Sequence, residues 1–496
     1  MKPGRRCHTA VLSGIVSMLG IPFAYAASEV EATENPPRAE NLRERLTERE
    51  DENRVDQPWT IDLFDHPLSA TAQYELSIDA VRQLMEDDPP EGETRSLLEQ
   101  EFEGEIFYSI GPQLSLLLQA RTGMERDLLS NTRRGVSDLF IERGEMWLHS
   151  ERAFGSRVVG FDIGRIDFED DRRWWWDEDL DAVRVTAGDE SLELAVAVAK
   201  ELGPTRTDRD FIEPDHEDVV RIIAEASWDW RDSHSLQLFA LFQDDRSRTH
   251  AIADVIELER EDESDARLRW LGARATGAWP LRSGGGIGYW FDAAWVSGDE
   301  YVLEFTAISP RQREVEERER RSVRGWGLDF GATWLMPFDF EPRLTAGYAR
   351  GSGDAHPDDR HDRSFRQTGL NANSPGFGGV QSFSGYGVLL DPDLSNIEIL
   401  TVGAGVSLWQ ASSLDVVYHR YRQVEASDSL GDARLTASLT ATDRDLGDGV
   451  DMVLAVEDSD RFEFELWFAA FRAGDAFGTQ RGRWTYGGFA AFRFAF

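Results

Sequence analysis

The stretch that decides the fold is Trp484–Phe496, which reads WTYGGFAAFRFAF. The alternate residues counted back from Phe496 are apolar and aromatic, whereas those between them are small, polar or basic apart from Phe489. Because successive side chains of a strand point to opposite faces, one face suits lipid and the other suits water. This pattern is typical of a transmembrane β-barrel strand with aromatic residues near both membrane interfaces.

The chain stops on Phe496, at the end of this predicted strand. That ending resembles the closing strand of bacterial outer-membrane proteins, in which a terminal Phe is part of the assembly signal. An edge strand of a soluble β-sandwich shows the same short alternation, so this stretch alone leaves both structures open.

The opposite end of the chain predicts export from the cytoplasm. Lys2, Arg5 and Arg6 precede an apolar run over residues 10–23, and Ala24–Ala26 reads as a small-x-small cleavage site. Residues 1–26 are therefore expected to be a signal peptide. The one cysteine, Cys7, lies inside it, so no disulfide is expected in the mature chain.

The composition of the chain excludes some structures and some classes of binding partner. No other segment approaches the apolar run of about 18 residues that a spanning helix needs. The net charge of −39, from 92 acidic and 53 basic residues, argues against nucleic acid. The mean hydropathy of −0.45 is compatible with a barrel, because only alternate strand residues face lipid.

The strand signals begin after a polar leader, residues 27–67, which is expected in the periplasm. Residues 68–496 then predict an all-β fold, a transmembrane antiparallel β-barrel of about 18 strands. The expected strands are 68–78, 95–110, 113–126, 138–150, 156–166, 179–187, 191–200, 219–231, 234–244, 266–280, 284–297, 322–336, 340–350, 396–409, 412–425, 448–457, 461–473 and 482–496.

Connector lengths discriminate between a barrel and a sandwich. Those after even-numbered strands are tight, as at Asp232–Ser233, whereas those after odd-numbered strands are long and polar, such as 298–321 and 351–395. Short periplasmic turns and long extracellular loops are the arrangement of outer-membrane barrels. Lipid satisfies no backbone polar group, so such a sheet must close on itself.

Four stretches carry a family resemblance: FDIGRIDFEDDRRWWWDEDLDAVRV at 161–185, FRQTGL at 365–370, DPDLSN at 391–396 and FRAGDAFG at 471–478. In this order they resemble the alginate export family of outer-membrane porins. The resemblance implies an eighteen-stranded monomeric barrel that passively exports an anionic polysaccharide through an electropositive constriction. It also implies lumenal roles for Arg165 and Glu145, and a place for Asp208 near the constriction. Strict alternation puts Arg165 in phase with Ile163, so it needs a bulge or the strand end to face inward.

The strand phases predict further lumenal residues. Arg121, Arg143, Arg184 and Arg274 fall on inward faces, and arginine suits an anion pathway because its guanidinium pairs with carboxylates and stays charged. Glutamates share these faces, so many of the arginines are equally expected to form structural pairs across strands. Trp174, Trp175 and Trp176 are candidates for sugar stacking, with loop packing or an interfacial belt as the alternative.

These observations favour a passive outer-membrane channel that exports or conducts an anionic polysaccharide or anionic solute. A general or cation-preferring porin is the alternative, and a surface-binding or enzymatic barrel with external 298–321 and 351–395 loops is a third. No motif of a known enzyme class is found, and no cofactor or metal is expected. The expected partners are outer-membrane lipid, the anionic cargo and periplasmic secretion or biosynthesis proteins.

Overall fold

The computed structural model describes residues 58–82, 94–111, 113–128, 137–150, 158–189, 191–214, 216–245, 247, 250–262, 264–357, 359–409, 411–435, 438–459 and 461–496. The predicted signal peptide, residues 1–26, lies outside these ranges, as does the predicted leader up to residue 57. Among the helices of the described ranges, none has the length and apolarity required to cross a membrane.

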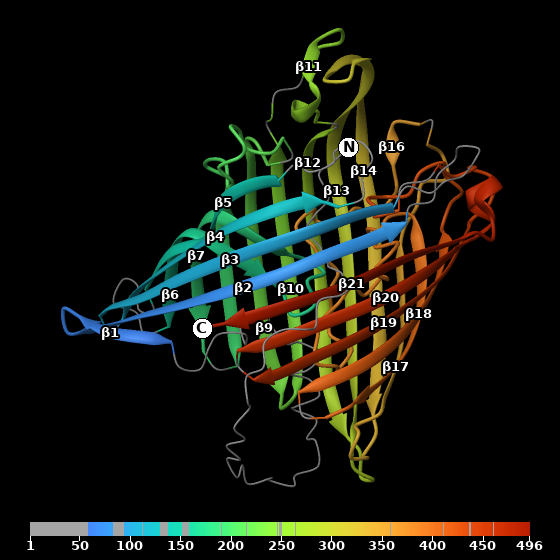
Figure 1. The fold of residues 1–496 in the computed structure, drawn as a ribbon. Helices are drawn as coiled ribbons and strands as arrows, with labels where there is room; N and C mark the ends of the chain where they lie inside the picture. Colours follow the sequence, from blue (N-terminus) through green and yellow to red (C-terminus); the bar gives the residue numbers. More distant parts are fainter. Residues whose placement is uncertain are drawn as a thin grey trace.

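Eighteen of the 21 strands in the described residues form one closed antiparallel wall (Figure 1). They are β2 (His66–Arg82), β3 (Thr94–Gly111), β4 (Leu114–Asp127), β5 (Ser137–Ser150), β6 (Val159–Glu169), β7 (Asp177–Gly188), β8 (Leu192–Ala199), β9 (Val219–Arg231), β10 (His234–Asp245), β12 (Ser264–Pro280), β13 (Gly286–Ser309), β14 (Gln312–Leu335), β15 (Arg343–Gly351), β17 (Ile397–Ser407), β18 (Ser412–Gln423), β19 (Asp445–Ser459), β20 (Phe462–Ala473) and β21 (Trp484–Ala495). Each pairs with its neighbours in the chain, and β21 pairs with β2 from Gln73↔Ala495 to Val81↔Gly487, which closes the wall. The predicted antiparallel barrel is confirmed.

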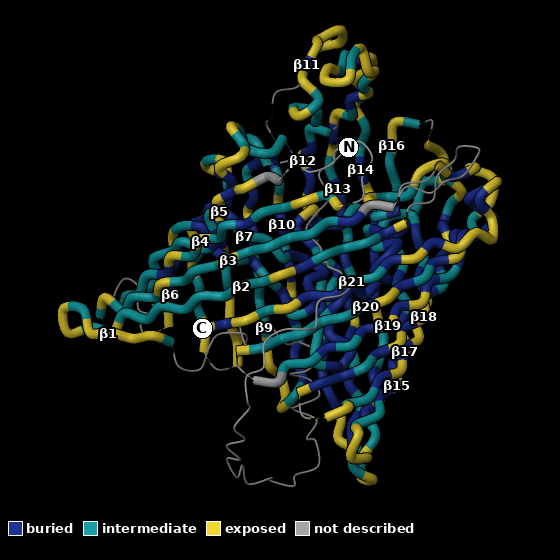
Figure 2. The backbone as a smooth tube through the Cα atoms, in the orientation of Figure 1, coloured by how far each residue is buried: buried dark blue, intermediate teal, exposed yellow. Residues whose placement is uncertain are grey.

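The side chains alternate between the two faces of the wall as the sequence predicts. On β10, Leu238 is 53% exposed and Phe242 is 39% exposed, whereas the intervening Phe239 and Leu241 are each 2% exposed. Figure 2 shows the same alternation of buried and less buried positions along many wall strands. The exposed set is apolar, so this outer surface matches the lipid-facing band of an outer-membrane barrel.

The connections differ in length between the two ends of the barrel. The turn between β9 and β10 consists of residues 232 and 233, with Ser233 at a φ of 60°, whereas 19 residues separate β8 from β9. The three remaining strands lie outside the wall: β1 (Trp59–Leu63) beside β2, and β11 (Val255–Glu257) and β16 (His361–Asp362) beside β14.

The expected loop at 298–321 is largely strand. β13 continues to Ser309 and β14 begins at Gln312, so the two strands form one long hairpin that rises above the barrel (Figure 1). Opposite charges and an aromatic ring face each other across this hairpin: Arg320 lies 3.5 Å from Asp299, and Arg318 lies 4.5 Å from the ring of Tyr301. Such cross-strand pairs stabilise a hairpin, and the polarity of the stretch hid them from a reading based on apolar alternation.

The segment 351–395 is predicted from the sequence to be an external loop, and much of it is instead buried inside the barrel. Phe365, Leu370, Phe377 and Leu394 are each no more than 4% exposed and belong to the main apolar cluster. Residues 369–390 carry no charged side chain and are rich in Gly, Ser and apolar residues. A segment of that composition can be buried without leaving unpaired charges.

A charge is expected to cost more stability on the lipid-facing surface of the barrel than on a surface exposed to water. Leu238→Arg places a charge near the middle of a lipid-facing strand and is expected to lower the free energy of unfolding by about 2–4 kcal/mol in phospholipid vesicles. Ile252→Arg is the control, because Ile252 is 62% exposed next to Ala253, which bonds Val315 of the hairpin above the barrel, and it is expected to change stability little. Urea titration followed by tryptophan fluorescence measures both, and equal losses would contradict the assignment of the two faces.

Candidate functional site

The hairpin of β6 and β7 leaves the wall and enters the lumen. β5 pairs with β6 only from Met146↔Arg165 to Ser150↔Phe161, and Gly164 adopts a φ of 137° at the point of departure. Beyond it, Asp179 of β7 lies 3.9 Å from the inward-facing Arg121 of β4. This positive φ changes the direction of the strand, and glycine adopts it without strain because it has no Cβ atom.

The segment that follows β8 takes over the vacated edge of β5. Arg143 donates its backbone N–H to the Thr205 carbonyl at 3.0 Å, and Thr207 donates to the Ile141 carbonyl at 2.9 Å. Edge groups of β5 are thereby hydrogen-bonded, as they must be in a wall that contacts lipid. Charged side chains bind this segment to the hairpin.

Arg143 and Arg165 both lie in that seam. Arg143 donates to both carboxylate oxygens of Asp181, at 2.6 and 2.8 Å, and to the carbonyl of Gly203 at 2.8 Å. Arg165 donates to Glu201 at 2.7 Å and is 7% exposed. In this structure both guanidinium groups are therefore engaged in structural pairs at the wall.

Three more predicted residues lie near these pairs. Glu145 accepts a hydrogen bond from Trp147 Nε1 at 2.7 Å. Arg184 donates to Asp162 at 2.9 Å. Asp208 is held by Arg206, at 2.8 and 3.0 Å, in the connection after β8, and this guanidinium lowers the pKa of the Asp208 carboxyl.

The tip of the hairpin, residues 170–176, is fixed to the far wall by buried ion pairs. Arg274 of β12 bonds Asp170 of the tip and also Asp292 of β13, the latter at 2.6 Å. Arg172 of the tip donates to Asp292 at 3.1 Å and to Asp329 of β14 at 3.0 Å. β4 and β13 are the third and eleventh of the eighteen wall strands, so the hairpin contacts nearly opposite sides of the barrel.

The segment 363–396 is bound to this tip. Ala372 donates its backbone N–H to the Arg173 carbonyl at 2.9 Å, and Asp177 donates to the Leu370 carbonyl at 2.5 Å. Trp174 Nε1 donates to the Tyr386 hydroxyl at 2.7 Å. We refer to residues 170–176 and 363–396 together as the lumen plug.

The plug reaches from the extracellular end of the barrel to the periplasmic end. Its second segment follows the end of β15, where Phe365 donates to the Ser352 carbonyl at 2.8 Å. Further along, Val380 donates to the hydroxyl of Ser413 at 2.9 Å, and Ser413 lies just after the turn that joins β17 to β18. The plug therefore spans the depth of the lumen.

The three candidate stacking residues belong to the plug. Trp174, Trp175 and Trp176 are 3%, 1% and 2% exposed, and Trp175 stacks on Phe239 of β10 with ring centroids 4.9 Å apart. No indole face of the three is open to a sugar in this structure. Their packing fixes the tip against the wall.

The plug covers some lumen-facing side chains of the wall and leaves others partly exposed. Behind it, Thr333 and His419 are fully buried and Arg343 is 2% exposed. Away from it, charged side chains of β2, β3, β4, β20 and β21 retain 12–26% exposure. We call this set the acidic wall: Glu75, Glu101, Glu103, Arg121, Glu463 and Arg493.

Each arginine of the acidic wall faces two glutamates. Arg493 donates to Glu75 at 3.2 Å and to Glu463 at 2.6 Å. Arg121 lies 3.8–3.9 Å from Glu103 and Glu101, beyond hydrogen-bonding distance. Its Nε is buried and has no hydrogen-bond partner within the described part of the chain.

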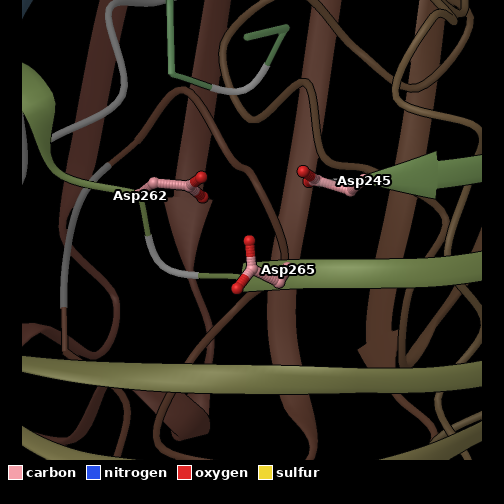
Figure 3. A group of neighbouring side chains, drawn as sticks. All are labelled: Asp245, Asp262 and Asp265. Atoms are coloured by element: carbon pink, nitrogen blue, oxygen red, sulfur yellow. The ribbon is translucent and has the colours of Figure 1, made fainter. Parts of the chain in front are cut away.

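Three carboxylates gather near the outer ends of β10 and β12, those of Asp245, Asp262 and Asp265 (Figure 3). One oxygen from each lies within 4.8 Å of the others, and carboxylate oxygens are the ligands that Ca²⁺ and Mg²⁺ prefer. The hydroxyl of Ser247 lies 2.6–2.9 Å from all three and ties the cluster together. Nothing else in the described structure points to an ion here, and none is assigned.

The alternation of side chains along single strands did not predict the ion network of the tip, because its members come from four separate elements. Arg274 was singled out as a lumenal residue, but Asp170, Arg172, Asp292 and Asp329 were not. The signal was present in the run of acidic, basic and aromatic residues over 169–177, since such a run inside a barrel requires partners for its charges.

Comparison with known proteins identifies a matching family and similar folds. The family model described as alginate export matches residues 133–487. The alginate production protein AlgE of Pseudomonas aeruginosa is 28% identical over 295 residues, 59% of this chain and 59% of that protein. AlgE of Pseudomonas syringae pv. tomato is 23% identical over 307 residues, 59% of this chain and 60% of that protein. Both alignments thus cover less than two thirds of the relative.

Among solved structures, OccAB1 of Acinetobacter baumannii superimposes with a TM-score of 0.55 at 10% identity, covering 89% of this chain and 99% of that one. At this identity the likeness concerns the fold alone.

The buried network predicts a large effect on stability. Arg274→Ala leaves Asp170 and Asp292 buried without their shared cation and is expected to lower the free energy of unfolding by about 3–5 kcal/mol. Lys200→Ala is the control, because its ion pair with Asp218 is 39% and 54% exposed and is expected to matter by less than about 1 kcal/mol. Chemical denaturation in vesicles measures both, and a loss for Arg274→Ala as small as that for Lys200→Ala would contradict the anchoring role.

Proposed function

This chain belongs to the alginate export family, and from that premise we propose that it is a passive channel for an anionic polysaccharide or smaller anions. The protein is an outer-membrane β-barrel of the porin type, and its family consists of channels and not of enzymes. The direction of transport that we propose is out of the cell.

The observation that carries the proposal is the state of Arg121. Its guanidinium faces the less covered part of the lumen, its carboxylate neighbours lie 3.8–3.9 Å away, and its Nε has no acceptor in the described residues. The Arg121 side chain is 21% exposed, so a passing carboxylate or other anion would form a charge-assisted hydrogen bond with the exposed part of its guanidinium. In contrast, Arg143, Arg165 and Arg274 each already donate at least one hydrogen bond to a carboxylate, at 2.6–2.7 Å.

Arg184 is the second lumenal attracting charge in this proposal. It is 30% exposed although its Nε donates to Asp162 at 2.9 Å and its Nη1 to the Asp167 carbonyl at 3.2 Å. Arg143, Glu145, Arg165 and Asp208 then act on the pathway indirectly, by holding the seam between β5 and the inward hairpin.

A cation-preferring channel is the second candidate, and the acidic wall favours it. Four glutamates face two arginines there, Arg121 and Arg493. A lumen lined by one sign of charge selects ions of the opposite sign. Under this alternative, membership of the family accounts for the fold, whereas the charge of the acidic wall determines which solutes pass.

The proposed partners are outer-membrane lipid, the anionic cargo and proteins of periplasmic secretion or biosynthesis, with the barrel acting as a monomer. Export requires that a polymer reach the periplasmic mouth, and docked proteins would deliver it there.

Ion selectivity tests the proposal. In a planar bilayer under a salt gradient, the reversal potential is expected to show anion preference, and oligo-uronates added to one side are expected to block conductance. Arg121→Gln is expected to reduce the anion-to-cation permeability ratio by about threefold or more, because it removes a lumenal charge at short range.

Arg320→Gln provides the matched control, because Arg320 is 61% exposed on the hairpin of β13 and β14 and loses the same charge outside the lumen. Cation preference in the unmodified protein, with no block by oligo-uronates, would contradict the anionic cargo and support the second candidate.

A further inference from the structure

An apolar hairpin extends the barrel wall beside the C-terminus. β1 pairs antiparallel with the start of β2, from Trp59↔Ala70 to Leu63↔His66, and the turn consists of Phe64 and Asp65 with φ of 54° and 64°. Two successive positive φ angles are typical of the tight turns that join hairpin strands. In Figure 1 this hairpin projects from the same end of the barrel as the C-terminus.

β1 continues the sheet edge at the point where the closing strand stops. Ala72 and Phe496 exchange two backbone hydrogen bonds, at 3.0 and 2.8 Å, and β1 takes up β2 from Ala70 onward. Successive parts of one edge of β2 are thus paired first with β21 and then with β1. The hairpin therefore extends the sheet along the edge of β2 and is not a detached tail.

The two faces of β1 differ in chemistry. Trp59 is 64% exposed and Ile61 is 40% exposed, and Phe64 at the turn is 84% exposed. The intervening Thr60 and Asp62 are polar and also exposed. A strand surrounded by water on both faces gains nothing from this alternation, whereas a strand with lipid on one face does.

The apolar face of β1 is continuous with the lipid-facing surface. The strand register places Trp59 opposite Ala70, Ala70 opposite Ile106, and Ile106 opposite Leu118. Ile106 is 43% exposed and Leu118 is 41% exposed on the outer face of the wall. A single row of outward side chains therefore runs from β4 to β1 without a change of face.

We propose that the hairpin of β1 and β2 lies against the periplasmic leaflet of the outer membrane, with Trp59, Ile61 and Phe64 at the boundary between phospholipid headgroups and acyl chains. Aromatic rings favour this boundary because it accommodates an apolar ring beside polar groups. The hairpin would hold the seam of the first and last wall strands in the bilayer. This inference does not depend on the identity of the cargo.

Site-directed labelling of opposite faces tests the proposal. Ile61→Cys and Thr60→Cys, each in the full chain with Cys7→Ser, are labelled with an environment-sensitive fluorophore and inserted into phosphatidylethanolamine–phosphatidylglycerol vesicles. Lipids that carry a quencher near the headgroup are expected to quench the probe at position 61 about twofold more than the probe at position 60. Aqueous iodide is expected to show the opposite preference.

Trp59→Cys and Asp62→Cys form a second pair on opposite faces of β1, in case a label at position 61 hinders assembly, and the same order is expected. Equal access of iodide to both faces, with no effect of the lipid quencher, would place the hairpin in water and overturn the proposal. Protection of both faces from both quenchers would show that protein covers the hairpin, either the preceding residues or a second copy, and would also overturn it.

Discussion

The structure depends on one constraint, which is that a backbone in lipid must satisfy its own hydrogen bonds. The antiparallel pairing of β2 with β21 closes the wall and leaves no edge of the first or last strand facing lipid. The same constraint explains the seam at β5. When the hairpin of β6 and β7 turns into the lumen, residues 205–207 take its place beside Ile141 and Arg143.

The inside of the barrel follows from its size. A wall of sixteen to eighteen strands encloses more space than its own side chains fill, and here two chain segments occupy part of it. The tip at 170–176 brings Arg172 and Asp170 to a wall that already carries Arg274, Asp292 and Asp329, so that charges buried together are also paired. The segment 363–396 is then held by backbone hydrogen bonds to that tip. The acidic wall remains partly exposed beside these segments, with 12–26% exposure of its side chains.

The sequence predicted the wall well because the wall obeys a local rule. Alternation at Leu236–Gln243 or Trp326–Trp334 reports the two faces directly, and all eighteen expected strands have a counterpart in the structure.

The position of the plug could not be predicted from alternation. Its position depends on contacts between residues far apart in the chain, such as Arg172 with Asp329 and Val380 with Ser413. Its composition, uncharged over 369–390, was the available signal. The roles of individual inward residues were harder still to predict, because alternation does not reveal a partner such as Glu201, which bonds Arg165 at 2.7 Å.

Because the plug spans the depth of the lumen, it is expected to set the bore of the channel, and one deletion tests this most directly. Gly385 donates its backbone N–H to the Asn373 carbonyl at 2.7 Å, so residues 374–384 can be removed and the ends rejoined through a short glycine linker. The deletion leaves the ion network of the tip in place but removes the part of the plug that reaches Ser413. Single-channel conductance in a planar bilayer is then predicted to rise severalfold over that of the unmodified protein. An unchanged conductance in a correctly folded variant would contradict the claim, because it would mean that the current does not pass the space this segment fills.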